Sequence, residues 1–306
     1  MLQKSAARKV LAIQGGGAHG AFAWGALDWL LEQGVRFDAM TGVSSGAMIA
    51  AMAVQGIVHN GPRGARAAVG QLWERVAAAH IFGPVNSSLD WMWGWDKGLE
   101  IGSEWAWQGL TNALRLFSPA HLNPFGQNPL APLLEDLLDI DAIRDESAPR
   151  LYVAATDVES GRARIFGNAE IGVEVLLASC CIPMMFPAVT IEGRHYWDGG
   201  YSCNPALAPV LHPAPEELIL IRAQPRIRKG VPSSTADIVH RLHEIAFQAP
   251  LDAELMALPA GVKLLDVSAD LALGAHPLTS KMNTEREFLN GLFKAGREAA
   301  AICLDA

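Results

Sequence analysis

Apolar positions along the chain follow two alternating patterns. Short, mainly apolar stretches predict buried strands at 9–14, 37–42, 217–223 and 262–267, a strand pair at 151–158 and 162–166, and a further strand within 188–200. Apolar residues at helical spacing predict helices at 21–34, 46–56, 64–80, 172–180, 235–258 and 284–304. Strands that alternate with helices indicate an α/β protein with a largely parallel sheet covered on both faces.

Composition narrows the class of protein. The chain has 306 residues, 50% of them hydrophobic and 18% charged, with a net charge of −8 and scattered basic residues. This balance argues against a nucleic-acid partner. No segment has the length and apolarity of a spanning helix, and the N-terminus has no secretory-signal pattern, so a cytoplasmic protein is expected. The four cysteines lack metal-ligand spacing and are expected to be reduced thiols: Cys180, Cys181, Cys203 and Cys303.

A glycine-rich turn follows the first predicted strand. Gly15, Gly17 and Gly20 have the G-x-G-x-x-G spacing of a dinucleotide site, in the expected place between a strand and a helix. That site also needs an acidic residue about 20 positions further on, at the end of the second strand. Asp38 is the nearby candidate, but it precedes the strand residues AMTG. A tight turn for close helix packing is the structural alternative.

A second motif changes the interpretation of these glycines. Residues 42–46 read Gly-Val-Ser-Ser-Gly, which is G-x-S-x-G between a strand and a helix. This nucleophile-elbow pattern holds its serine, here Ser44, at a helix N-terminus, where developing negative charge is favoured. A serine that attacks an ester also needs backbone N–H groups to bind the oxyanion. The bare amides of Gly15, Gly16 and Gly17 are candidates for that role.

The serine needs a general base. Asp198 follows a predicted strand and precedes Gly199 and Gly200, although Asp-Gly-Gly alone is also a turn signal. A Ser-Asp-His triad stays open by chain order. The histidines that follow Asp198 are His212, His240, His243 and His276. Three further residues are expected to line the site: His19, Ser45 and Gly199.

Taken together, GGGAHG, GVSSG and DGG in this order resemble the patatin-like phospholipase family, over residues 8–210. The resemblance implies a three-layer αβα fold and a serine acyl hydrolase that cleaves fatty-acyl esters of phospholipids or lysophospholipids. It implies Ser44 as nucleophile, Asp198 as base and Gly15, Gly16 and Gly17 as the oxyanion loop, with no cofactor and no metal. The family usually has Arg or Lys where this chain has His19. Residues 211–306 are expected to pack on the same domain and are assigned no chemistry.

A tryptophan-rich insertion is expected within residues 81–132. Its tryptophans are Trp91, Trp93, Trp95, Trp105 and Trp107. They are interpreted either as a lid or peripheral membrane contact, or as a satellite core or homodimer contact. Two other functions stay open: a Rossmann-type nucleotide-binding oxidoreductase, and a catalytically silent patatin-like scaffold that binds lipid.

Overall fold

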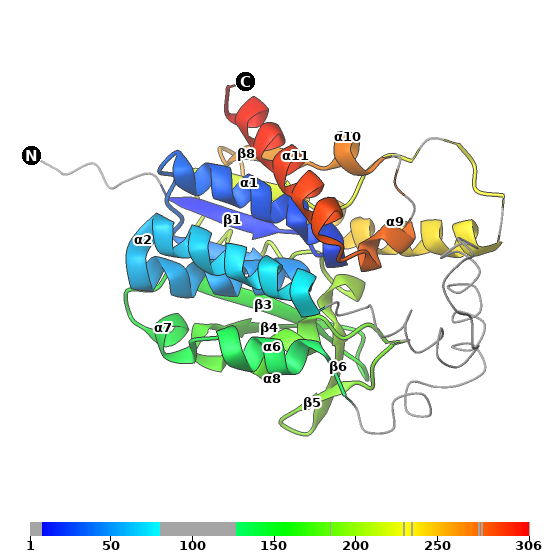
Figure 1. The fold of residues 1–306 in the computed structure, drawn as a ribbon, viewed down its shortest axis with the longest axis horizontal. Coiled ribbons are helices and arrows are strands. Elements are labelled where there is room, and N and C mark those ends of the chain that lie inside the picture. The colour runs from blue at the N-terminus through cyan, green and yellow to red at the C-terminus, as the bar shows by residue number, and fades with distance from the viewer. Residues whose placement is uncertain are drawn as a thin grey trace, which may run out of the picture.

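The computed structural model describes residues 8–79, 127–183, 185–228, 230–233, 235–274, 276 and 278–305. In this part of the chain an eight-stranded sheet forms the centre of the molecule (Figure 1). Its strands are β1 (Lys9–Ile13), β2 (Ala39–Gly42), β3 (Arg150–Asp157), β4 (Ala163–Gly167), β5 (Val189–Ile191), β6 (Arg194–Asp198), β7 (Glu217–Arg222) and β8 (Lys263–Ser268). Their order is β5-β6-β3-β2-β1-β7-β8, with β4 paired to β3.

The sheet is mainly parallel, as predicted. Strands β3, β2, β1, β7 and β8 run parallel to their neighbours in that order. Strands β4 and β6 each pair antiparallel with β3, and β5 pairs antiparallel with β6. Strands β7 and β8 lie in the same sheet as β1, so the chain after residue 211 shares the central sheet with the chain before it.

Helices cover both faces of the sheet, which confirms the layered α/β fold. The helices are α1 (Gly20–Glu32), α2 (Ser45–Ala79), α6 (Leu130–Leu137), α7 (Ile140–Arg144), α8 (Val173–Ser179), α9 (Thr235–Met256), α10 (Asp270–Leu273) and α11 (Arg286–Asp305). The short 3-10 helices are η1 (Gly17–His19), η2 (Asn168–Glu170), η3 (Gly199–Tyr201) and η4 (Leu278–Met282). Figure 1 shows α1, α2 and α11 side by side over one face.

Alternation along the strands divides the core into two layers. In β1, Leu11 and Ile13 face the large core under α1, α2 and α11, whereas Val10 and Ala12 face the opposite side. There the chain around Leu207–Leu211 and the second half of α9 cover the sheet, with Leu251 fully buried. Because successive side chains of a strand point to opposite faces, one apolar strand can serve both layers.

The last helix lies close against the first. A Cβ on Gly25 of α1 would collide with the carbonyl oxygen of Phe293, and a Cβ on Gly296 of α11 would collide with that of Phe22. Each helix therefore presents a glycine to the backbone of the other, which allows an unusually close approach. The C-terminal helix is thus an integral part of the fold.

Several elements differ from the prediction. The two helices expected at 46–56 and 64–80 are present, but they meet within one element, α2, at a break around Asn60 and Gly61, where the backbone leaves helical geometry. Helix α6 begins at Leu130, inside the stretch expected to be irregular. The single strand expected within 188–200 is a hairpin, β5 and β6, that turns at Glu192 and Gly193, both with positive φ.

Candidate active site

The sheet brings the predicted serine and aspartate to the same edge. Strand β2 runs parallel to β3 and ends with Gly42 opposite Val153. Strand β6 runs antiparallel to β3 and ends with Asp198 opposite Ala155. Ser44 and Asp198 therefore both lie beside the second half of β3, toward its carboxyl end. Ligands of open α/β sheets commonly bind at the carboxyl ends of the strands.

Ser44 lies at a sharp turn between β2 and α2. Its φ of 55° is positive, which is uncommon for a residue with a Cβ and typical of a strained nucleophile elbow. The buried Ser179 hydroxyl supports this turn, since it accepts a hydrogen bond from the Ser44 N–H at 2.9 Å and donates to the carbonyl of Ala154 at 2.8 Å. Helix α2 begins at the next residue, so the serine is at a helix N-terminus.

Asp198 is buried beside Ser44. Its residue is 3% exposed, and burial raises the pKa of its carboxyl from 3.8 to about 6. Three interactions oppose that rise: a 2.8 Å hydrogen bond from the Gly200 N–H, the nearby side-chain hydroxyl of Ser44, and the charge of Lys281. The backbone is fixed as well, because the Asp198 N–H donates to the carbonyl of Cys181 at 2.8 Å.

The glycine loop lies directly against the serine. A Cβ on Gly15 would stand 2.8 Å from the Cβ of Ser44, so only glycine allows this approach. The Gly15 N–H donates to Asn204 Oδ1 at 2.8 Å, and the Gly16 N–H donates to Ser45 Oγ at 3.2 Å. Within the described ranges, the Gly17 N–H has no acceptor, which leaves it free for an anionic oxygen.

Three residues were predicted to line the site: His19, Ser45 and Gly199. All three are buried, and their contacts hold neighbouring parts of the site in place. The ring of His19 is completely buried, and its Nε2 lies 2.7 Å from Ser280 Oγ. Burial, followed by the charges of Lys281 and Arg228, lowers the pKa of His19 well below its ordinary value, so the ring is neutral. Ser45 holds the glycine loop through Gly16, and Gly199 lies tightly against the carbonyl of Ala154.

The later histidines do not meet the serine and aspartate in the described structure. His212 is exposed and lies 3.1 Å from the carbonyl of Ala208. His243 is exposed on α9, and His276 packs its ring against Phe288 at 5.4 Å. The side chain of His240 lies outside the described residues. His195, near the base in sequence, is exposed and bonds Thr190 at 3.0 Å.

Sequence reasoning missed five residues that surround these groups: Ser179, Cys180, Asn204, Gln224 and Lys281. Two of them lie in the segment LLASCC, and Asn204 follows Asp198 closely, so proximity in sequence was a usable signal. The Cys180 thiol lies near the Ser44 side chain, and burial raises the pKa of the thiol well above its ordinary value, so the thiol stays protonated. Gln224 and Lys281 belong to no motif that the sequence analysis found. They lie in residues 211–306, to which no chemistry was assigned.

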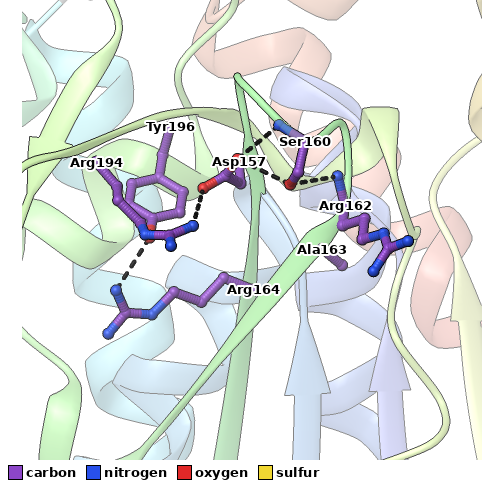
Figure 2. Close-up of a pocket in the computed structure, with 7 residues that line it drawn as sticks. All are labelled: Asp157, Ser160, Arg162, Ala163, Arg164, Arg194 and Tyr196. Carbon is purple, nitrogen blue, oxygen red and sulfur yellow. Dashed lines mark hydrogen bonds and ion pairs between the residues drawn. The ribbon is translucent and has the colours of Figure 1, made fainter.

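A separate hollow of about 360 Å³ lies at the β3–β4 turn and β6. Figure 2 shows its lining residues, with Arg162 pointing away from the other two arginines. Those two are paired: Arg194 bonds Asp157 at 3.2 Å, and Arg164 bonds Tyr196, Glu170 and Glu192. These acidic partners neutralise two of the three arginines that line the hollow.

Other predictions concern absences or the insertion. All four cysteines are free thiols. Among the described residues, no cluster of three or more His, Cys, Asp or Glu side chains could hold a metal ion. No helix in the described ranges has the length and apolarity needed to cross a bilayer. The five tryptophans of the insertion lie outside the described residues, so their role stays a prediction.

Comparison with known proteins identifies the family. The patatin-like phospholipase family model matches residues 11–211, and the chain therefore belongs to the patatin-like phospholipase family. Membership supports a lipid acyl hydrolase as the class of protein, and it favours this class over the Rossmann-type oxidoreductase.

Two solved structures resemble the chain at 15% identity. VipD from Legionella pneumophila matches with a TM-score of 0.44, over 98% of this chain and 67% of that one. Full-length ExoU, solved in complex with full-length SpcU from the type III secretion system of Pseudomonas aeruginosa, matches with a TM-score of 0.32 over 98% of this chain. The present chain spans only 53% of that second protein. No match was found among curated proteins.

Proposed function

We propose that this protein is a serine acyl hydrolase that cleaves fatty-acyl esters of lipids, including phospholipids, through Ser44 and Asp198. One observation carries the proposal: the side chain of Ser44, held at positive φ, lies close enough to the buried carboxyl of Asp198 to lower the pKa of that carboxyl. A nucleophile and a base within hydrogen-bond reach are the minimum needed for this chemistry.

The environment of Asp198 supports its role as base. A carboxylate with an ordinary pKa accepts a proton poorly near neutral pH. Burial raises the pKa of Asp198 to about 6, which makes the carboxylate a stronger base that is still ionised at pH 7. Asp198 takes the proton from Ser44 Oγ as that oxygen attacks the ester carbonyl carbon.

The glycine loop supplies the electrostatic support. The tetrahedral intermediate carries a negative oxygen that needs preorganised N–H donors. Gly15, Gly16 and Gly17 are proposed as the oxyanion loop, and Gly17 is the one whose N–H has no acceptor among the described residues. The protonated Asp198 then gives its proton to the leaving alcohol, and water hydrolyses the acyl-serine ester by the reverse sequence.

The test is turnover of p-nitrophenyl acyl esters of several chain lengths, together with labelling by a fluorophosphonate probe. Ser44→Ala is expected to abolish labelling and to reduce kcat by at least about 10³-fold. Asp198→Asn is expected to reduce kcat by a similar order, and the wild type is expected to lose kcat/KM below about pH 6.

Two exposed positions provide matched controls. Ser233→Ala and Asp141→Asn make the same chemical changes away from the site and are expected to keep wild-type activity. An unlabelled, inactive wild type would instead favour the catalytically silent lipid-binding scaffold. Full activity in Asp198→Asn would show that another residue is the base, and it would favour a triad with a histidine. Release of fatty acid from phosphatidylcholine vesicles tests phospholipid as the substrate.

A further inference from the structure

The C-terminal region contributes a cation to the edge of the candidate site. Lys281 lies in η4, outside the segment matched by the family model. Its ammonium Nζ donates a hydrogen bond of 3.0 Å to Gln224 Oε1. The buried Gln224 donates in turn through Nε2 to the carbonyl of Gly15 at 2.7 Å. Because Gly15 lies against Ser44, this chain of contacts leads from the ammonium to the nucleophile.

The backbone of Lys281 also touches the glycine loop. A Cβ on Gly17 would stand 2.6 Å from the carbonyl oxygen of Lys281. This contact places Lys281 beside the one loop residue whose N–H is free in the described structure. Two independent contacts, one through the side chain and one through the main chain, therefore fix Lys281 at the oxyanion loop.

The ammonium has unused hydrogen-bonding capacity. Of the residues that the structure describes, Gln224 provides its only acceptor, so two of its three N–H groups remain available. Lys281 is half-buried and close enough to Asp198 for each charge to shift the pKa of the other. A partly desolvated ammonium with free donors favours an anionic oxygen nearby.

We infer that Lys281 is the counter-cation of the site, which balances the Asp198 carboxylate at rest and the substrate oxyanion during ester cleavage. This inference rests on the proposed function. When the proton moves from Ser44 to Asp198, the negative charge moves from the carboxylate to the carbonyl oxygen of the substrate. A fixed ammonium at the glycine loop stabilises the negative charge on the substrate oxygen once it has formed there, and no cation has to move during the transfer.

Other charged groups also surround Lys281. Burial is the main cause that lowers the pKa of Lys281 to about 8; Glu244 and Asp198 oppose this decrease, and Arg228 adds to it. The titratable or charged groups that interact with its charge are Asp198 on β6, Arg228 before α9, His243 and Glu244 on α9, and His19 in η1. Glu244 forms ion pairs with Arg228 at 2.9 Å and Arg241 at 3.1 Å, so that of the two described carboxylates that raise the pKa of Lys281, Asp198 is the one without an arginine partner.

The inference predicts a specific change in the pH profile. Lys281→Met is expected to lower kcat/KM for an uncharged p-nitrophenyl ester by about tenfold or more. The acid limb is expected to move above pH 6, because loss of the cation raises the pKa of Asp198. Lys281→Arg is expected to recover part of the activity and to move the alkaline limb from near pH 8 to higher pH, since arginine stays charged.

Lys294→Met is the matched control, because Lys294 is exposed on α11. If Lys281→Met retains kcat/KM within twofold of wild type and keeps the same acid limb, the inference is wrong while the dyad stands. If Lys281→Met does not fold, Lys281→Arg decides, because an unchanged alkaline limb in that variant overturns the inference. An inactive, unlabelled wild type would instead overturn the proposed function and, with it, this role for Lys281.

Discussion

The hydroxyl of Ser179 joins the N–H of Ser44 to the carbonyl of Ala154, with hydrogen bonds of 2.9 and 2.8 Å. One buried hydroxyl thus ties the strained turn after β2 to the neighbouring strand β3. Ser44 needs such support because a positive φ is unfavourable for a residue with a Cβ. A side chain from helix α8 therefore maintains the orientation of the proposed nucleophile.

Ser179→Ala is expected to lower both stability and turnover. The substitution leaves a buried N–H and a carbonyl with one partner fewer, which costs about 1–3 kcal/mol. Urea denaturation measures this loss, and ester hydrolysis by the folded variant measures the effect on Ser44. Ser233→Ala removes an exposed hydroxyl and is expected to behave as wild type. Equal stability of the two variants would contradict the supporting role of Ser179.

Asp198→Asn is expected to make the protein more stable at neutral pH. The folded protein holds the pKa of Asp198 at about 6, above its ordinary value of 3.8, so folding opposes ionisation of this carboxyl. Between these two values the folded state binds more protons than the unfolded state, and stability falls as pH rises. Above pH 6, ionisation of the buried Asp198 carboxyl lowers the free energy of unfolding by about 3 kcal/mol in full.

Asparagine removes that cost and keeps an oxygen to accept from the Gly200 N–H. Unfolding free energies of Asp198→Asn and wild type are expected to differ by about 3 kcal/mol at pH 8 and to converge near pH 4. Asp141→Asn, at an exposed carboxyl, is expected to show no comparable gain. A gain that is independent of pH would refute the explanation by desolvation.

Gly17→Ala is expected to be more damaging than Gly34→Ala. Both glycines have positive φ, 60° and 77°, so alanine strains the backbone at either position. At Gly34 nothing lies within 4 Å of the added methyl group, whereas at Gly17 the carbonyl of Lys281 lies 2.6 Å from it. The comparison isolates this contact, which is expected to cost roughly 1–3 kcal/mol more and to reduce turnover. Thermal unfolding of both variants measures the difference.

His19→Gln is expected to reduce the sensitivity of the fold to acid. Burial and nearby cations hold the pKa of His19 well below 6.5 in the folded state, so the unfolded state binds more protons as the pH falls. Below pH 6.5 this histidine costs up to about 1.4 kcal/mol of stability for each pH unit, until the folded-state pKa is reached.

Asp198 acts in the opposite direction in the same pH range, so the informative quantity is the difference between variant and wild type. His19→Gln is expected to gain stability relative to wild type between pH 7 and pH 5. His212→Gln, at an exposed histidine, is the control and is expected to show no such gain. Parallel stability curves for His19→Gln and wild type would show that His19 is not held neutral.

The sequence reveals some of this site because local patterns fix it. The turn at Gly15–Gly17, the elbow at Ser44 and the aspartate at the end of β6 are each set by residues within a few positions, and short motifs encode such turns well. Ser179 contacts Ser44, 135 positions away, and Lys281 contacts Gly17, roughly 260 positions away. Short motifs cannot predict contacts between residues so far apart in the sequence. The helix predicted at 235–258 is confirmed, since α9 continues through Pro250 to Met256.

The position of β7 beside β1 limits how far the chain can be truncated from its C-terminus and still fold. The match to the family model ends at residue 211, but β1 has hydrogen-bonded partners on both sides, β2 and β7. A fragment ending near residue 211 would expose the N–H and C=O groups of Lys9–Ile13 as an open, apolar strand edge, which invites aggregation. It would also lose Gln224, Lys281 and the helix packed on Gly25. The autonomous folding unit therefore extends beyond the recognisable family segment into the C-terminal third of the protein.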